Sequence, residues 1–127
     1  MLGISTTNDL WKTYKTLSNR TGVEGKPVKV AQIVRGVLSE SLPSPDTEEG
    51  LARARKYGTD WERTRSASSS PRSNRQLYLP TSMVRSLRRL SMILEDRGHS
   101  TSISAIVSGV LSENVPSVSD IRKLVNS

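Results

Sequence analysis

The chain has 127 residues, enough for one compact domain or two small interlocked ones and too few for most enzymes with a separate substrate domain. Nineteen Lys and Arg against twelve Asp and Glu give a net charge of +7, which favours a polyanionic partner such as nucleic acid or an anionic membrane surface. The absence of Cys excludes disulfides and thiolate metal sites, and the lone His99 cannot form a histidine metal site by itself.

Hydropathy and aromatic content narrow the class of partner. No apolar run approaches the roughly 18 residues of a membrane span, and the first residues lack the basic-then-apolar order of a signal peptide. We therefore expect a soluble, unexported protein without a membrane partner. Aromatic residues are few and Phe is absent, so a stacking platform for single strands is poorly supplied. Double-stranded nucleic acid is therefore a better-supported partner than a single strand.

An internal repeat organises the chain. The segment IVRGVLSESLPS, which begins at Ile33, returns as IVSGVLSENVPS from Ile106, a displacement of 73 residues. The same displacement pairs most apolar positions of the two parts, Tyr14 with Leu87 among them. It predicts two copies of one supersecondary unit. The expected parts are a first unit at 1–44, an auxiliary helix and Ser-rich linker at 45–73, a second unit at 74–117 and a short C-terminal helix at 118–127.

The first copy has the weaker strand. LGIST predicts a short strand, followed by a helix from about Asn8 to Thr21. A second helix is expected to open at Pro27, which is preorganised for a first helical turn. DTEEGLARARKYG, from Asp46, predicts a third, auxiliary helix. Irregular chain is expected between Tyr57 and Asn74, with helix around Trp61 as the alternative, and SASSSPRS at 66–73 is typical of a linker.

The second copy shows its parts most clearly. RQLYLP alternates apolar and polar residues, which predicts a half-buried strand ended by Pro80. TSMVRSLRRLSMILEDRG predicts an amphipathic helix with its N-cap at Thr81 or Ser82 and with Gly98 past its end. STSISAIVSGVLSENV predicts a second helix, and SDIRKLVNS a short third one. The candidate caps of the second helix are Ser100, Thr101 and Ser102.

This order of elements resembles the MetJ/Arc-type ribbon-helix-helix family of DNA-binding proteins, in two copies that together cover about two thirds of the chain. The resemblance implies that the two strands pair as an antiparallel ribbon whose outer side chains enter the major groove. One unit cannot bury its apolar helix faces or pair its single strand, so two units must interlock. We therefore predict a mostly α fold with a short β ribbon, a tandem ribbon-helix-helix that forms an intramolecular pseudo-dimer.

The resemblance also assigns site residues. Base-contacting positions fall on the strands, where Gln and Asn suit pairing with adenine, and the alternative is a solvated strand face. Phosphate contacts fall where the second helix of each copy begins, with plain capping and ordinary surface lysines as the alternatives. The expected base-contacting residues are Asn74, Gln76 and Tyr78 in the second copy and Gly3 and Ser5 in the first. The expected phosphate-contacting residues are Lys26, Lys29, Ser100 and Thr101.

Other conspicuous residues have structural interpretations. Arg85, Arg88 and Arg89 form a basic run on a helix, which usually lies on a solvated face and here contributes at most nonspecific attraction. Trp11 and Tyr14 occupy positions whose repeat partners are Val84 and Leu87, so core packing is favoured over base stacking. No carboxylate pair, phosphate-binding glycine loop or nucleophile constellation is present, so we expect neither an enzyme nor a cofactor.

These observations predict sequence-specific binding of double-stranded DNA by a cytoplasmic, nucleoid- or plasmid-associated protein. Its role would be that of a transcriptional regulator or of an accessory factor in plasmid or mobile-element DNA processing, in a relaxosome or in partition. Tandem copies in one chain are similar in design to conjugative relaxosome accessory proteins, which implies a DNA-processing partner such as a relaxase. Further assembly on DNA stays open. The alternative is a protein-interaction module, such as an antitoxin or an assembly adaptor.

Overall fold

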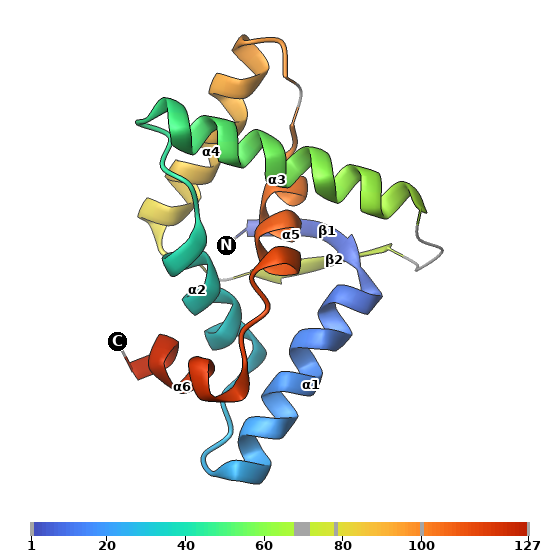
Figure 1. Ribbon diagram of the computed structural model, residues 1–127, viewed down its shortest axis with the longest axis vertical. Helices are drawn as coiled ribbons and strands as arrows, with labels where there is room; N and C mark the ends of the chain where they lie inside the picture. The colour runs from blue at the N-terminus through green and yellow to red at the C-terminus, as the bar shows by residue number, and fades with distance from the viewer. Residues whose placement is uncertain (1, 68–71, 78, 100, 127) are drawn as a thin grey trace.

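The computed structural model describes residues 2–67, 72–77, 79–99 and 101–126, which form a mostly helical protein with one two-stranded antiparallel sheet (Figure 1). The expected fold class, mostly α with a short β ribbon, is confirmed at this level. The elements in chain order are β1 (Leu2–Thr7), α1 (Asn8–Glu24), α2 (Val30–Ser41), α3 (Glu48–Ala67), β2 (Arg72–Leu77), α4 (Thr81–Asp96), α5 (Ile103–Glu113) and α6 (Val118–Asn126).

The sequence repeat is also a repeat of helices. α1 and α4 begin at Asn8 and Thr81, and α2 and α5 begin at Val30 and Ile103, so both pairs of helix starts are 73 residues apart. The strands do not keep this spacing, because β2 covers Arg72–Leu77 whereas β1 covers Leu2–Thr7. Pairing with a partner strand therefore sets the bounds of β2 more than its place in the repeat does.

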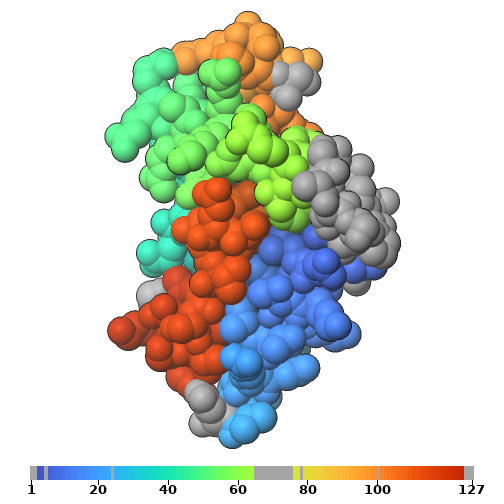
Figure 2. Space-filling view, turned by 45° about the vertical axis from the view of Figure 1, so that its right-hand side comes forward, coloured from blue at the N-terminus to red at the C-terminus, as the bar shows by residue number. Residues whose placement is uncertain are grey.

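Each half of the chain packs against the other half. β1 and β2 pair antiparallel, and α3, which follows the first copy, packs against α5 and α4 of the second. α6, which follows the second copy, packs against α2 and α1 of the first. In Figure 2, atoms of the last part of the chain, orange and red, fill the space between the green α3 and the blue α1. The apolar faces of each half are thus covered by helices of the other half.

The repeated motif carries a glycine where these helices cross. Gly36 and Gly109 are equivalent in the two copies. A Cβ added to Gly109 would lie 2.3 Å from the carbonyl oxygen of Tyr57 in α3, and one added to Gly36 would lie 3.0 Å from the Cβ of Leu124 in α6. The backbones approach so closely that a side chain at Gly109 would displace α3. This close packing of backbones accounts for the glycine at 109, whereas the nearest atom to Gly36 belongs to a side chain.

The second helix begins later than the sequence predicts. The expected start at Pro27 is wrong, because α2 begins at Val30 with Lys29 as its N-cap residue. The preceding segment is held in place by α1: the Ser18 hydroxyl donates to the Val28 carbonyl at 2.6 Å, and the Val28 N–H donates to Thr21 Oγ1 at 2.9 Å. The first of these contacts occupies the Val28 carbonyl, which would accept an intrahelical hydrogen bond in a helix that began at Pro27.

The auxiliary helix is longer than expected. Irregular chain between Tyr57 and Asn74 was the main expectation, yet α3 continues to Ala67 and β2 already begins at Arg72, inside the expected linker. Of that linker, residues 68–71 lie outside the described residues. Tyr57 and Trp61 are both buried, at 7% and 6% exposure, so packing stabilises this part of the helix where its composition does not.

The helix ends differ in detail from the predicted ones. The prediction of Thr81 or Ser82 as N-cap of α4 is wrong, because the cap residue is Pro80, whose carbonyl accepts the first helical N–H groups. The expected end of α4 is confirmed: Gly98 has φ +82°, and the N–H of His99 donates to the Leu94 carbonyl at 2.8 Å, as in a Schellman turn. α5 is capped by Ser102, the third of the three candidates.

Candidate nucleic-acid interface

The two strands form a ribbon in which one cross-strand pair joins equivalent residues of the two copies. In the antiparallel register Gly3 lies opposite Gln76, and these two positions are 73 residues apart. Both are exposed, whereas the neighbouring Ile4 and Leu77 are buried at 1% and 2% exposure. The ribbon therefore has one solvent-facing side and one side that joins the core, as alternation along a strand requires.

The expected base-contacting residues fall together on this ribbon. The register places Ser5 opposite Asn74, next to the Gly3–Gln76 pair on the period-two alternation. Four of the five predicted positions thus form two cross-strand pairs, which the Ile4–Arg75 pair separates, and Gly3 and Gln76 of these four are exposed. Tyr78, the fifth, lies outside the described residues.

The ribbon is held to the helices by hydrogen bonds on its buried side. The hydroxyls of Thr6 and Ser108 lie 3.0 Å apart and are both buried, which joins β1 to α5 across the repeat. The next residue, Thr7, ends β1 and is at the same time the N-cap of α1, because its Oγ1 accepts a hydrogen bond from the Leu10 N–H at 3.3 Å. The strand therefore has a fixed orientation relative to both helices, and the exposed side of the ribbon does too.

The second helices of the two copies begin on opposite sides of the ribbon (Figure 1). At the start of α2, Lys26 and Lys29 are both exposed, and the Lys29 N–H donates to Gln32 Oε1 at 3.1 Å. Arg122 of α6 donates from Nη2 to the carbonyl of Thr21, near the end of α1, at 3.4 Å. This end of the molecule therefore combines positive side chains with the positive end of a helix dipole.

The start of α5 differs from that of α2. Ser102 Oγ accepts from the Ala105 N–H at 3.1 Å, as an N-cap does. Thr101 lies against α3, where a Cβ added to Gly58 would be 2.3 Å from the Thr101 Cγ2 atom. Gly58 and Thr101 line a surface hollow, and Glu62 of α3 lines it as well. Ser100, the other phosphate-contacting candidate here, lies outside the described residues. Because α3 flanks this helix start and brings a carboxylate to it, the two helix starts are not electrostatically equivalent.

The contribution of α3 to this site was not predicted from the sequence. A sequence pattern for it was present, since Leu51, Ala54, Tyr57 and Trp61 recur at helical spacing, and all four are buried.

The basic run on α4 is solvent-exposed, as predicted, because Arg85, Arg88 and Arg89 are all exposed. Arg89 forms an ion pair with Asp46 at 2.9 Å. Arg97 near the end of α4 forms a two-pronged contact with Glu48 and lowers the pKa of that carboxyl by hydrogen bonding and charge.

Tyr14 and Trp11 are core residues, as predicted. Tyr14 is fully buried and Trp11 is half-buried against the same core.

Among the residues that the structure describes, no group of three or more His, Asp or Glu is placed to hold a metal ion. Within the same residues, no helix is both long enough and apolar enough to cross a membrane. Comparisons with models of known families, with curated proteins and with solved structures found no match to this chain.

Proposed function

We propose that this chain is a tandem ribbon-helix-helix protein that folds as an intramolecular pseudo-dimer and binds double-stranded DNA with its ribbon in the major groove. The observation that carries the proposal is the register of the ribbon, which pairs Gly3 with Gln76, equivalent residues of the two copies. A dimer of two identical units would pair its strands in the same way, with equivalent residues opposite each other at the two-fold axis. The matching helix starts support the same interpretation.

The exposed side of the ribbon suits a groove. A major groove about 12 Å wide admits a two-stranded ribbon. Gln76 and Asn74 carry amides, which can pair with the edge of adenine in two hydrogen bonds. Gly3 and Ser5, opposite them in the register, are small and leave room for the DNA backbone or bases to approach. The two strands should therefore contact DNA unequally, and the preferred site should lack two-fold symmetry.

Phosphate contacts would also be unequal. Lys26 and Lys29 flank the start of α2 and are exposed, so this end can neutralise phosphates by charge. At the start of α5, Thr101 packs against Gly58 and Glu62 lines the adjoining hollow, which disfavours a close phosphate there. The α2 end is therefore the principal phosphate anchor in this proposal, and the α5 end contributes less than the sequence analysis expects.

The cellular role follows from the resemblance rather than from the site. Either a transcriptional regulator or an accessory factor in plasmid or mobile-element DNA processing would use such an interface. The tandem arrangement favours the accessory role, with a relaxase or a similar DNA-processing protein as second partner and no chemistry of its own. Footprinting on DNA that flanks the gene separates the two roles, because an operator and a transfer origin lie in different surroundings.

The direct experiment is a titration of duplex DNA at several salt concentrations. Because phosphates are neutralised by Lys and Arg, the logarithm of the affinity should fall with the logarithm of salt with a slope of roughly −0.9 per phosphate. A single-stranded oligonucleotide of the same length serves as the control and should bind more weakly, since the chain has few aromatic residues and no Phe on which bases could stack. A slope close to zero, or preference for the single strand, would refute duplex DNA as the partner.

A further inference from the structure

The second helices of the two copies differ along one ridge of their surface. The positions of this ridge are three residues apart, so neighbouring side chains on it lie next to each other. The ridge consists of Lys29, Gln32 and Arg35 in the first copy and of the equivalent Ser102, Ala105 and Ser108 in the second. The first copy therefore carries long polar and basic side chains where the second carries short uncharged ones.

The contact made by Ser108 shows what the last position of this ridge faces. Its hydroxyl donates a hydrogen bond of 3.0 Å to Thr6 Oγ1 on the buried side of β1. The residue equivalent to Thr6 is Leu79, which follows β2. In agreement with this equivalence, Arg35 lines a hollow of about 280 Å³ together with Pro80, the residue after Leu79. Arg35 therefore leaves α2 beside the point at which the second strand ends.

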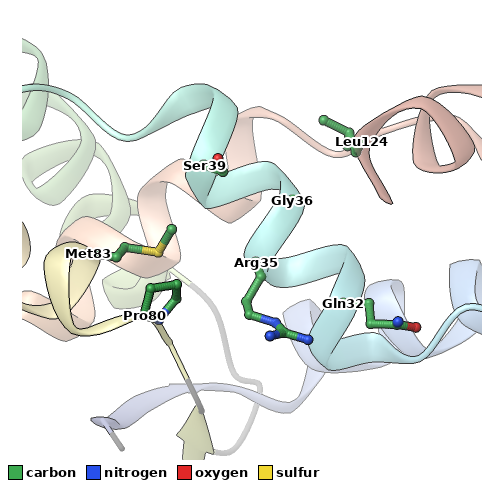
Figure 3. Close-up of a pocket in the computed structure, with 7 residues that line it drawn as sticks. All are labelled: Gln32, Arg35, Gly36, Ser39, Pro80, Met83 and Leu124. Carbon is green, nitrogen blue, oxygen red and sulfur yellow. The ribbon is translucent and has the colours of Figure 1, made fainter. Parts of the chain in front are cut away.

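The positive charge of Arg35 is not used inside the protein. Its side chain is exposed, whereas that of Ser108 is buried. Among the residues that the structure describes, none forms a hydrogen bond or an ion pair with the Arg35 guanidinium. Figure 3 shows this side chain extended from α2 and directed away from Leu124 of α6, which also lines the hollow. The first copy thus presents a positive charge next to the ribbon where the second copy has a buried serine.

We infer that Arg35 contacts a DNA phosphate on the side of the ribbon where α2 lies, and that the second copy makes no equivalent contact. The inference rests on the proposed function, in which the ribbon lies in the major groove, and adds to it a residue beyond the helix starts. A ribbon in the groove has a sugar-phosphate backbone along each of its two sides. An arginine beside the ribbon can therefore donate hydrogen bonds to a phosphate and fix the position of the protein on the duplex.

A phosphate is favoured over a base edge because of the level at which Arg35 begins. In the second copy the equivalent Ser108 meets Thr6, which lies on the buried side of β1. The base edges would face the other side of the ribbon, where Gly3 and Gln76 are exposed. A side chain that starts at the core side of the ribbon meets the DNA backbone, which forms the wall of the groove, before it meets the bases. The contact should therefore be independent of the DNA sequence.

The experiment titrates the full chain with two duplexes at several salt concentrations, one a site selected from a random pool by the native chain and the other a scrambled version of it. Arg35→Gln should weaken binding to both duplexes equally, by about tenfold, because one charged contact is lost. The dependence on salt should become shallower, with the log-log slope changing by about 0.9.

Arg88→Gln is the matched control for this variant. Arg88 is likewise an exposed arginine on a helix, but it lies about two turns into α4 and outside the hollow. Its replacement should change the affinity by no more than about twofold and leave the salt slope unchanged. Thermal melts check that both variants are folded.

Arg35→Lys tests whether the contact is to a phosphate. A lysine keeps the positive charge but lacks the planar fork with which arginine pairs with a guanine edge. The affinity should therefore stay within about threefold of that of the native chain on both duplexes. If either Arg35→Gln or Arg35→Lys weakens binding to the selected duplex alone, Arg35 contacts a base and the phosphate assignment is wrong.

A second measurement locates Arg35 on the DNA. The chain contains no Cys, so Arg35→Cys and Arg88→Cys each carry a single thiol to which an iron chelate can be attached. The chelate at position 35 should cleave the DNA backbone at one edge of the selected site, next to the phosphate that Arg35 contacts. The chelate at position 88 should give little cleavage.

The outcomes separate this inference from the proposed function. Duplex binding by the native chain with equal effects of Arg35→Gln and Arg88→Gln would overturn the inference and leave the proposed function standing. Cleavage of equal strength from positions 35 and 88 would do the same. If the native chain does not bind duplex DNA at all, the proposed function and the inference both fail.

Discussion

The hydroxyl of Tyr14 in α1 donates a hydrogen bond of 2.7 Å to the main-chain carbonyl of Leu111 in α5, across 97 residues of sequence. Leu111 lies within the last turn of α5, where carbonyls lack a partner inside the helix. In the first copy the equivalent carbonyl, that of Leu38, accepts from the Leu42 N–H at 2.9 Å, and the residue equivalent to Tyr14 is Leu87, which has no hydroxyl. Each half thus satisfies the same carbonyl in its own way.

Removing the Tyr14 hydroxyl should destabilise the fold. Tyr14→Phe leaves a buried carbonyl without its donor, and the free energy of unfolding should fall by about 1–3 kcal/mol. Urea denaturation measures the change. Tyr57→Phe is the matched control, because the Tyr57 hydroxyl has only the longer contacts at 3.3 and 3.5 Å, and it should cost less. If Tyr57→Phe costs as much as Tyr14→Phe, the buried bond is not what stabilises the pairing of the halves.

The same residue predicts a loss of stability in strong alkali. Burial raises the pKa of Tyr14 well above its ordinary value near 10. Above about pH 10, the ordinary pKa, the tyrosine ionises in the unfolded chain but stays neutral in the folded one. The unfolded state therefore binds fewer protons, and the stability falls as the pH rises. Below about pH 9 the tyrosine is neutral in both states, so its titration does not change the stability. Denaturation of the native chain and of Tyr14→Phe at pH 8 and pH 11 should give a smaller decrease for the variant, and equal decreases would contradict the assignment.

The two equivalent glycines should respond differently to the same substitution. Gly109→Ala places a Cβ 2.3 Å from a main-chain oxygen, so α3 must move, and the free energy of unfolding should fall by about 1–3 kcal/mol. Gly36→Ala meets only a side-chain atom at 3.0 Å and gains the better helix propensity of Ala, so it should stay within about 0.5 kcal/mol of the native chain. Chemical denaturation distinguishes them. Equal costs would mean that the α3 crossing is not tighter than the α6 crossing.

The helices could be predicted from sequence because their determinants are local or repeated. The 73-residue displacement placed all four main helices, and alternation placed Leu77 on the inner side of its strand. What failed depends on contacts between distant segments. The start of α2 is set by Ser18 and Thr21 of another helix, and the continuation of α3 past Tyr57 is set by packing on α5. A Ser-rich composition indicates a linker, yet Arg72 and Ser73 join the sheet because Thr7 and Thr6 lie opposite them.

In the candidate site, too, some features could be predicted from the sequence and others depend on contacts between distant segments. The resemblance to ribbon-helix-helix proteins implied that Gly3, Ser5, Asn74 and Gln76 would come together, and the register places them in two cross-strand pairs. The approach of α3 to Thr101 could not be predicted, since it is a contact between segments that are distant in the sequence.

The ribbon should form within one chain in solution. Because β1 and β2 pair intramolecularly and each half covers the other, the folded protein should remain a monomer on dilution. Light scattering after size-exclusion chromatography measures its mass, and circular dichroism at the same concentrations follows the helix content. A dimer that loses helix on dilution would indicate that the copies pair between chains instead.

The central claim, that the exposed side of the ribbon contacts bases, is tested most directly by titrating two duplexes with three proteins. The duplexes are a site selected from a random pool by the native chain and a scrambled version of it, at one salt concentration. The proteins are the native chain, Gln76→Ala, and Asn19→Ala, which removes an exposed amide from α1 away from the ribbon. Because base contacts discriminate between sequences and phosphate contacts do not, Gln76→Ala should weaken binding to the selected site by about 1–3 kcal/mol and leave the scrambled duplex nearly unchanged. Asn19→Ala should affect neither. Equal losses on both duplexes for Gln76→Ala, or no loss on the selected site, would contradict the account.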